Sequence, residues 1–142
     1  MGFIKVKNNS QRLKDELVRL ETLNPALYDI LKGLKYYVLR AFGKDIVLTM
    51  IQRTKEEQDM IYSGVVRGIR KYDEKPWKSP HQIWTAFDIR TKMFTNKEIK
   101  AIKNYLNSKH NSDNGYAWTA KYHEVTNSKG KKLGKHFHIQ FV

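Results

Sequence analysis

The sequence predicts an α+β fold, in which a small, mostly antiparallel sheet is flanked by helices in a single domain. Helical spacing of apolar residues dominates the N-terminal third, and short alternating or β-branched runs dominate the rest. A chain of 142 residues suits one domain with a modest core. We therefore expect an N-terminal helical part over residues 1–44 and a core that carries the functional residues over 45–142.

Two helices are expected in the N-terminal part. Ser10 is a suitable N-cap for a first helix over residues 11–22. The pair Asn24-Pro25 interrupts the chain, and proline suits the first turn of a second helix that ends at Gly43. The second helix carries apolar residues at i, i+3 and i+4 spacing: Leu27, Ile30, Leu31, Leu34 and Val38. This stripe predicts that the second helix packs on the core.

The middle of the chain is expected to alternate strand and helix. Residues 46–51 are β-branched and apolar, which indicates a buried strand. Thr54 and Glu57 have capping-box spacing, which predicts a short helix to about Tyr62. Residues 63–80 contain glycines and prolines and are expected to form a long loop.

The C-terminal part is expected to supply three more strands and one helix. Residues 85–91 alternate between apolar and polar, as a strand does. Thr95 and Glu98 form another capping box and open a helix. Strands over 117–126 and 136–142 follow, joined by a hairpin loop rich in lysine and glycine. The predicted order is ααβαβαββ.

The composition limits both the chemistry and the partners. Without cysteine, the chain has neither a disulfide scaffold nor a cysteine-ligated metal site. No apolar run approaches the ~18 residues of a membrane span. The N-terminus lacks the apolar segment of a signal peptide, so we expect synthesis in the cytoplasm without one. The net charge of +13 favours a polyanionic partner, either nucleic acid or an anionic cell wall.

The segment KHFHIQF near the C-terminus carries the clearest chemical pattern. Side chains alternate between the two faces of a strand. One face is expected to join the core, with Phe137, Ile139 and Phe141. The other face then carries His136, His138 and Gln140. Two imidazoles on one polar face of an apolar strand are typical of a metal site.

A second segment, SPHQIWTAFDIRT, adds two possible ligands. His81 precedes the predicted strand and Asp88 lies within it. Together with His138 they offer two imidazoles and one carboxylate, which suit zinc with a position left for water. Glu124 is the candidate general base, because a symmetric hairpin would place it opposite His136. Arg53, at the end of the first strand, could hold a substrate carboxylate.

These residues resemble a known family of enzymes. The pattern Ser79-x-His81-x6-Asp88, followed downstream by His136-x-His138, is similar to the zinc D-alanyl-D-alanine carboxypeptidases and phage L-alanyl-D-glutamate endopeptidases. These peptidoglycan peptidases share their metal-site plan with the hedgehog signalling domain. The resemblance covers residues 46–142 and implies Zn2+ at His81, Asp88 and His138.

The resemblance also implies roles for other residues. Arg53 falls on the family's substrate-binding arginine, and Ser79 is assigned to substrate binding with it. Glu124 would take a proton from the attacking water, while His136 would either stabilise the transition state or orient a neighbouring residue. Trp84 stands where many members have glycine, and we expect it to contact substrate and reshape the cleft. The Glu-x-x-His arrangement common at the last ligand is absent, since Lys135 precedes His138 by three residues.

The resulting prediction is a zinc metallopeptidase that cleaves the stem peptide of peptidoglycan. Its expected partners are peptidoglycan and anionic wall polymers. It would act on the wall after release from the host cytoplasm as an endolysin, or as a component of the virion. One alternative is an inactive wall-binding module of the same fold. A nucleic-acid-binding protein is disfavoured, because there is no Gly-rich phosphate loop and no second carboxylate cluster.

Overall fold

A computed structural model of the chain describes residues 4–52, 81, 83–126 and 132–142, with the backbone alone for 123–126 and 132–134. The helix predicted from Thr54 to Tyr62 lies outside the described residues, as does the whole of the predicted loop over 63–80. The described residues are sufficient to establish the sheet, its helical cover and the candidate site.

Five strands form one sheet in the order β1-β2-β3-β5-β4. The strands are β1 (Lys5–Val6), β2 (Val47–Met50), β3 (Ala86–Arg90), β4 (Ala120–Thr126) and β5 (Lys132–Gln140). β1 and β2 run parallel, while the other three pairings are antiparallel. The predicted α+β class with a mostly antiparallel sheet is therefore confirmed. β1 was not predicted, and β5 begins at Lys132 rather than His136 because the hairpin ladder extends further than its loop-like composition indicates.

Three helices accompany the sheet: α1 (Gln11–Leu23), α2 (Pro25–Phe42) and α5 (Asn96–His110). Ser10 accepts a hydrogen bond from the backbone N–H of Leu13 and caps α1, as predicted. Gly43 ends α2 with a φ of 64°, a left-handed conformation that glycine adopts without steric cost. The capping box of Thr95 and Glu98 opens α5. No described helix combines the length and the apolar character required to cross a membrane.

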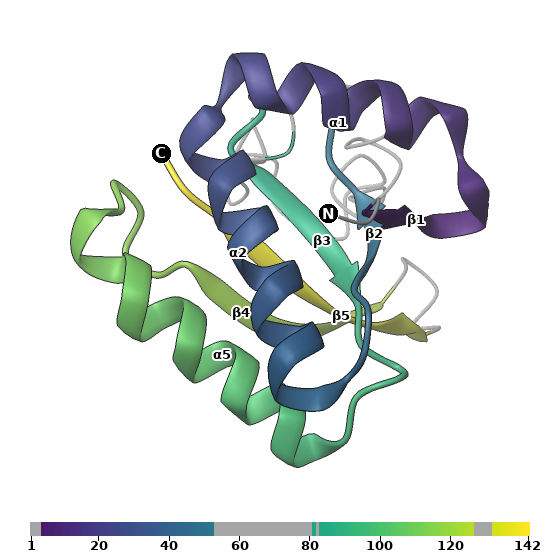
Figure 1. Cartoon of the computed structure of the whole chain (residues 1–142), viewed down its shortest axis with the longest axis vertical. Coiled ribbons are helices and arrows are strands. Elements are labelled where there is room, and N and C mark those ends of the chain that lie inside the picture. Colours follow the sequence, from purple (N-terminus) through teal and green to yellow (C-terminus); the bar gives the residue numbers. More distant parts are fainter. Residues whose placement is uncertain (1–3, 53–80, 82, 127–131) are drawn as a thin grey trace, which may run out of the picture.

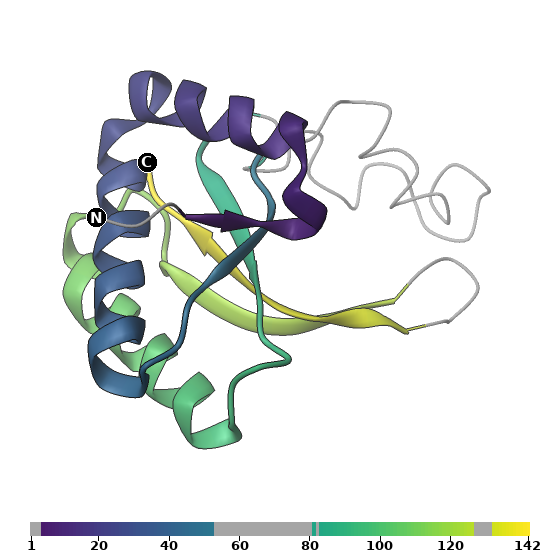
Figure 2. The same ribbon diagram turned by 45° about the vertical axis from the view of Figure 1, so that its right-hand side comes forward.

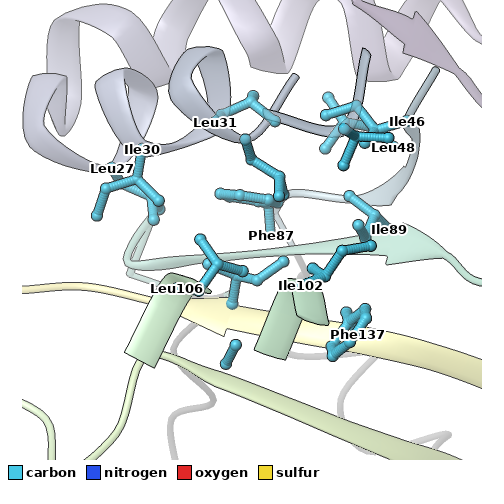
Figure 3. Packing of buried hydrophobic residues seen from close by; sticks show 14 of the residues in the cluster. Leu27, Ile30, Leu31, Ile46, Leu48, Phe87, Ile89, Ile102, Leu106 and Phe137 are labelled. Carbon is cyan, nitrogen blue, oxygen red and sulfur yellow. The ribbon is translucent and has the colours of Figure 1, made fainter. Parts of the chain in front are cut away.

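α2 and α5 cover one face of the sheet, and the core lies between these helices and the sheet (Figures 1 and 2). Figure 3 shows Leu31 of α2 and Leu106 of α5 directed toward Phe87 of β3. β3 also supplies Ile89, and the neighbouring strand β5 supplies Phe137 and Ile139; all three are fully buried. Since side chains alternate along a strand, the residues between these positions lie on the opposite face. That face holds the candidate site.

The backbone at Trp84 has a φ of +62°, in the left-handed region. A bulky residue is strained there, whereas glycine is not. The Trp84 carbonyl accepts a hydrogen bond from the Asn24 side chain, and the ring packs against the hydrophobic core. The ring thus has a packing role, and its predicted contact with substrate stays a prediction.

Candidate metal centre

The structure brings His81, Asp88 and His138 together on the face of the sheet opposite α2 and α5. One ligand atom from each of the three side chains lies within 4.8 Å of the other two, a group that could hold a metal ion. The His81 Nε2 and the His138 Nδ1 each lie 3.1 Å from the same oxygen, Asp88 Oδ1. The predicted ligand set is therefore close together in space.

The strand register explains how two of the ligands meet. Asp88 in β3 pairs directly with His138 in β5, at the centre of the sheet. Directly opposite residues of an antiparallel pair share a face, which places the carboxylate beside the imidazole. His81 lies outside the strands and reaches the same carboxylate from the preceding turn. Segments distant in the chain thus supply one site.

The site is largely closed to solvent. The exposed fractions of the side chains are 1% for His81, 7% for Asp88 and 12% for His138. Burial on its own raises the pKa of Asp88. The positive charges of His81 and His138, and their hydrogen bonds to the carboxylate, outweigh burial and hold this pKa well below its usual range. Asp88 is therefore ionised at neutral pH, the state that a metal ligand requires.

The outward-facing nitrogen of each ligand histidine meets an oxygen acceptor. His81 Nδ1–H donates to the backbone carbonyl of Ile51 at 2.9 Å, since a carbonyl can only accept. His138 Nε2 lies 3.0 Å from Gln140 Oε1. The Gln140 amide nitrogen donates to the Trp118 carbonyl at 3.3 Å, which turns the amide oxygen toward His138. Such acceptors keep a proton on the outer nitrogen of each ring, so that a metal ion can displace the proton that faces Asp88 and bind His81 Nε2 and His138 Nδ1.

Gln140→Leu is expected to weaken the affinity of this site for a metal ion about 10–100-fold, as the loss of an outer partner of a ligand histidine does elsewhere. Without the amide oxygen, His138 no longer has the acceptor that favours the proton on Nε2. Competition with a chromophoric chelator measures the affinity. Gln140→Glu keeps an acceptor oxygen and is the control. Wild-type affinity in Gln140→Leu would show that Gln140 does not determine the tautomer.

His136 lies beside the ligands without being one of them. Its Nε2 is 3.4 Å from Asp88 Oδ2, the carboxylate oxygen that does not face the ligand histidines. The side chain is 17% exposed, more than any of the three ligands. In the register, His136 pairs with Arg90 of β3. The prediction that His136 and His138 share a face is confirmed.

Trp118 and Lys121 border the site, although the sequence favours a core position for Trp118 and gives no site role to Lys121. The Trp118 ring meets His138 edge-on, with the ring centroids 5.7 Å apart. Lys121 pairs with His138 across β4 and β5, and its Nζ lies 5.7 Å from the centroid of the Trp118 ring. Trp118 precedes strand β4, so the alternation of side chains along a strand, which identified His136 and His138, predicts nothing about its position.

The expected register of Glu124 is wrong. Glu124 pairs with Lys135, whereas His123 pairs with His136. Next to the loop the ladder pairs Thr126 with Lys132, closer to the N-terminus than the expected symmetric turn places it, and the bulge between Val125 and Thr126 corrects only one residue of that difference. A one-residue shift exchanges the two faces of a strand, so the register gives no support to Glu124 as the residue opposite His136. Its catalytic role stays a prediction.

Two further predicted site residues, Arg53 and Ser79, lie outside the described residues. Their roles in substrate binding stay predictions that rest on the sequence resemblance.

Comparisons with known proteins do not add to this description. The chain matches no protein-family model, no curated protein and no solved structure.

Proposed function

We propose that the chain is a zinc-dependent peptidase that hydrolyses a peptide bond in the stem peptide of bacterial peptidoglycan. The observation that carries the proposal is the convergence of His81 Nε2, Asp88 Oδ1 and His138 Nδ1 in a buried site. Two imidazoles and one carboxylate are the ligand chemistry of catalytic rather than structural zinc sites, which mostly use four protein ligands and thiolates.

The surrounding residues fit a resident metal ion. The ligand histidines have acceptors at their outer nitrogens, and Asp88 is held in its ionised form. When bound, zinc supplies Lewis-acid activation of water and of a carbonyl group. A network made only for stability gains little from two imidazoles gathered around one buried carboxylate, because burying such charges is costly.

The chain's own residues supply the remaining steps. His136, next to Asp88 and partly exposed, donates a ring N–H hydrogen bond to the carbonyl oxygen as negative charge develops there. Asp88 Oδ2 lies close enough to orient the His136 ring for this task. Glu124 remains the candidate acceptor for the proton of the attacking water. Arg53 remains the candidate partner of a substrate carboxylate.

The choice of peptidoglycan as substrate rests on the sequence pattern and on charge. The spacing of Ser79, His81, Asp88, His136 and His138 resembles that of the peptidoglycan peptidases, including phage-encoded members. A net charge of +13 would concentrate the protein on an anionic wall and its polymers. An endolysin released after synthesis, or a lytic enzyme carried in the virion, fits both features.

The test combines metal content with cleavage. We expect about one zinc per purified, untagged chain by plasma mass spectrometry, and release of new amino groups from purified muropeptides. A chelator should stop cleavage and zinc should restore it. His138→Ala should lose both zinc and cleavage. The matched control is His110→Ala, which replaces a half-buried histidine at the end of α5 and should keep both.

Two results would contradict the proposal in different ways. A chain that takes up no zinc, even after incubation and dialysis, would exclude the peptidase mechanism. A chain that binds zinc and wall fragments but releases no amino groups would indicate an inactive wall-binding module.

A further inference from the structure

Glu16 is a buried acidic residue in α1, a helix whose other charged residues are mostly exposed. Its side chain is 10% exposed, and the residue belongs to the buried face that also carries Leu13 and Leu20. Leucine residues would suffice to dock this helix on the sheet. A buried carboxylate is costly unless it is paired and hydrogen-bonded, so its partners indicate what it does.

The partners of Glu16 join α1 to the backbone just beyond β2. Glu16 Oε2 pairs with Arg12 Nε at 2.7 Å. Glu16 Oε1 accepts a hydrogen bond from the backbone N–H of Gln52 at 3.2 Å, and Arg12 Nη2 donates to the Gln52 carbonyl at 3.1 Å. The Arg12–Glu16 pair therefore contacts both polar backbone groups of one residue.

The N–H that Glu16 holds belongs to the same peptide group as a carbonyl at the metal centre. The Gln52 N–H and the Ile51 C=O form one planar unit and point in opposite directions. The Ile51 carbonyl accepts the hydrogen bond of His81 Nδ1–H at 2.9 Å. Fixing the N–H end of this peptide thus fixes the direction of the oxygen that orients His81.

The arrangement is also favourable electrostatically. A carboxylate at the N–H end of a peptide polarises the group and makes its carbonyl a stronger acceptor. A stronger acceptor at Nδ1–H makes the opposite ring nitrogen a better metal ligand. The relay runs from the Glu16 carboxylate through the Ile51–Gln52 peptide to His81, whose Nε2 faces Asp88.

We propose that Glu16 is a positioning residue for the metal centre, and that it orients and strengthens the ligand His81 through the Ile51–Gln52 peptide group. The inference rests on the metal site of the proposed function. It assigns the N-terminal helix α1 a role in that site beyond packing.

The first test measures zinc affinity by chelator competition, without substrate. Glu16→Leu should bind zinc about tenfold more weakly than wild type, at the lower end of the range for outer partners of ligand histidines. Glu16→Gln keeps an acceptor oxygen for Gln52 and should lose less. The matched control is Leu13→Ala, which removes a buried core contact of the same helix and no polar group that could hydrogen-bond to Gln52. All variants are measured at a temperature where circular dichroism shows them folded.

The outcomes separate this inference from the proposed function. Wild-type affinity in Glu16→Leu overturns the inference, and so does an equal loss in Leu13→Ala, which would indicate a general effect of destabilisation. A wild-type chain that fails to bind zinc would overturn the metal site itself.

A second readout needs no metal. In the metal-free wild type, NMR should detect a His81 Nδ1–H that exchanges slowly with water, because it is buried and hydrogen-bonded. Glu16→Leu should speed this exchange, whereas Leu13→Ala at matched stability should not. Unchanged exchange in Glu16→Leu would refute the relay.

Discussion

Asp88→Asn is expected to lower zinc affinity by more than 100-fold, beyond the 10–100-fold effect of outer partners, because it alters a ligand itself. Asp88 Oδ1 is the atom that both ligand nitrogens approach. Among the three ligands it supplies the negative charge. Asparagine keeps the size and one oxygen but not the charge, so the variant isolates the electrostatic contribution of the carboxylate to metal binding.

Thermal unfolding measures this loss without any assumption about substrate. A ligand at about 1,000 times its dissociation constant stabilises the folded state by roughly 4 kcal/mol. In a domain of this size that corresponds to a rise of roughly 10–20 °C in the unfolding midpoint. We expect this rise in the wild type when zinc replaces a chelator, and at most about a third of it in Asp88→Asn, because a 100-fold weaker affinity leaves zinc at only about ten times its dissociation constant.

Asp45→Asn is the control for removing an acidic residue. Asp45 pairs with Lys5 and Lys35, and these ion pairs hold its pKa below the usual range. It takes no part in the described ligand group, so this variant should keep the full zinc-dependent rise. A zinc-dependent rise in Asp88→Asn as large as that of the wild type would show that the ion binds elsewhere.

The ligands were predictable because their signals are local. Alternation in KHFHIQF places His136 and His138 on one face and Phe137 on the other, and the structure confirms this division. Asp88 lies between Phe87 and Ile89, which are both buried in the core, so the same rule assigns it to the polar face. The alternation of side chains along a strand thus assigns each residue to a face of the sheet, even when the neighbouring strands are unknown.

Register was less predictable, because it depends on the geometry of the turn. The symmetric hairpin expected for Glu124 differs from the observed pairing by one residue, and that difference exchanges the two faces. Neither the position of the turn nor that of the bulge has a clear signature in a segment rich in lysine and glycine. The pairing of Asp88 with His138, by contrast, joins strands far apart in the chain, and only the folded sheet reveals it.

The supporting residues were missed because their roles come from tertiary contacts. Glu16 has the sequence context of an exposed helix residue, yet it accepts a hydrogen bond from the backbone N–H of Gln52, 36 residues away in the chain. Gln140 was placed on the correct face, but its effect on His138 depends on the carbonyl of Trp118. β1 has only two residues, too few to show any alternation.

His136→Ala is expected to lower turnover of muropeptides by about 10²–10³, the cost of removing one donor to a developing oxyanion. Zinc content should stay near that of the wild type, because His136 lies outside the described ligand group. Its Nε2 approaches Asp88 Oδ2, not the oxygen that faces His81 and His138. The two measurements together separate a role in the reaction from a role in holding the ion.

Glu124→Gln and His123→Ala extend this experiment to the neighbouring strand. In the register His123 pairs with His136, and Glu124 pairs with Lys135. If Glu124 takes the proton from water, Glu124→Gln should lose about 10²–10⁴ in turnover and keep its zinc. If His123→Ala loses turnover while Glu124→Gln does not, the residue that the register places opposite His136 takes part in the reaction, and Glu124 does not.

The outcome for His136→Ala decides the role of His136 itself. Full turnover in this variant would limit His136 to orienting Asp88, and the oxyanion would then need another hydrogen-bond donor.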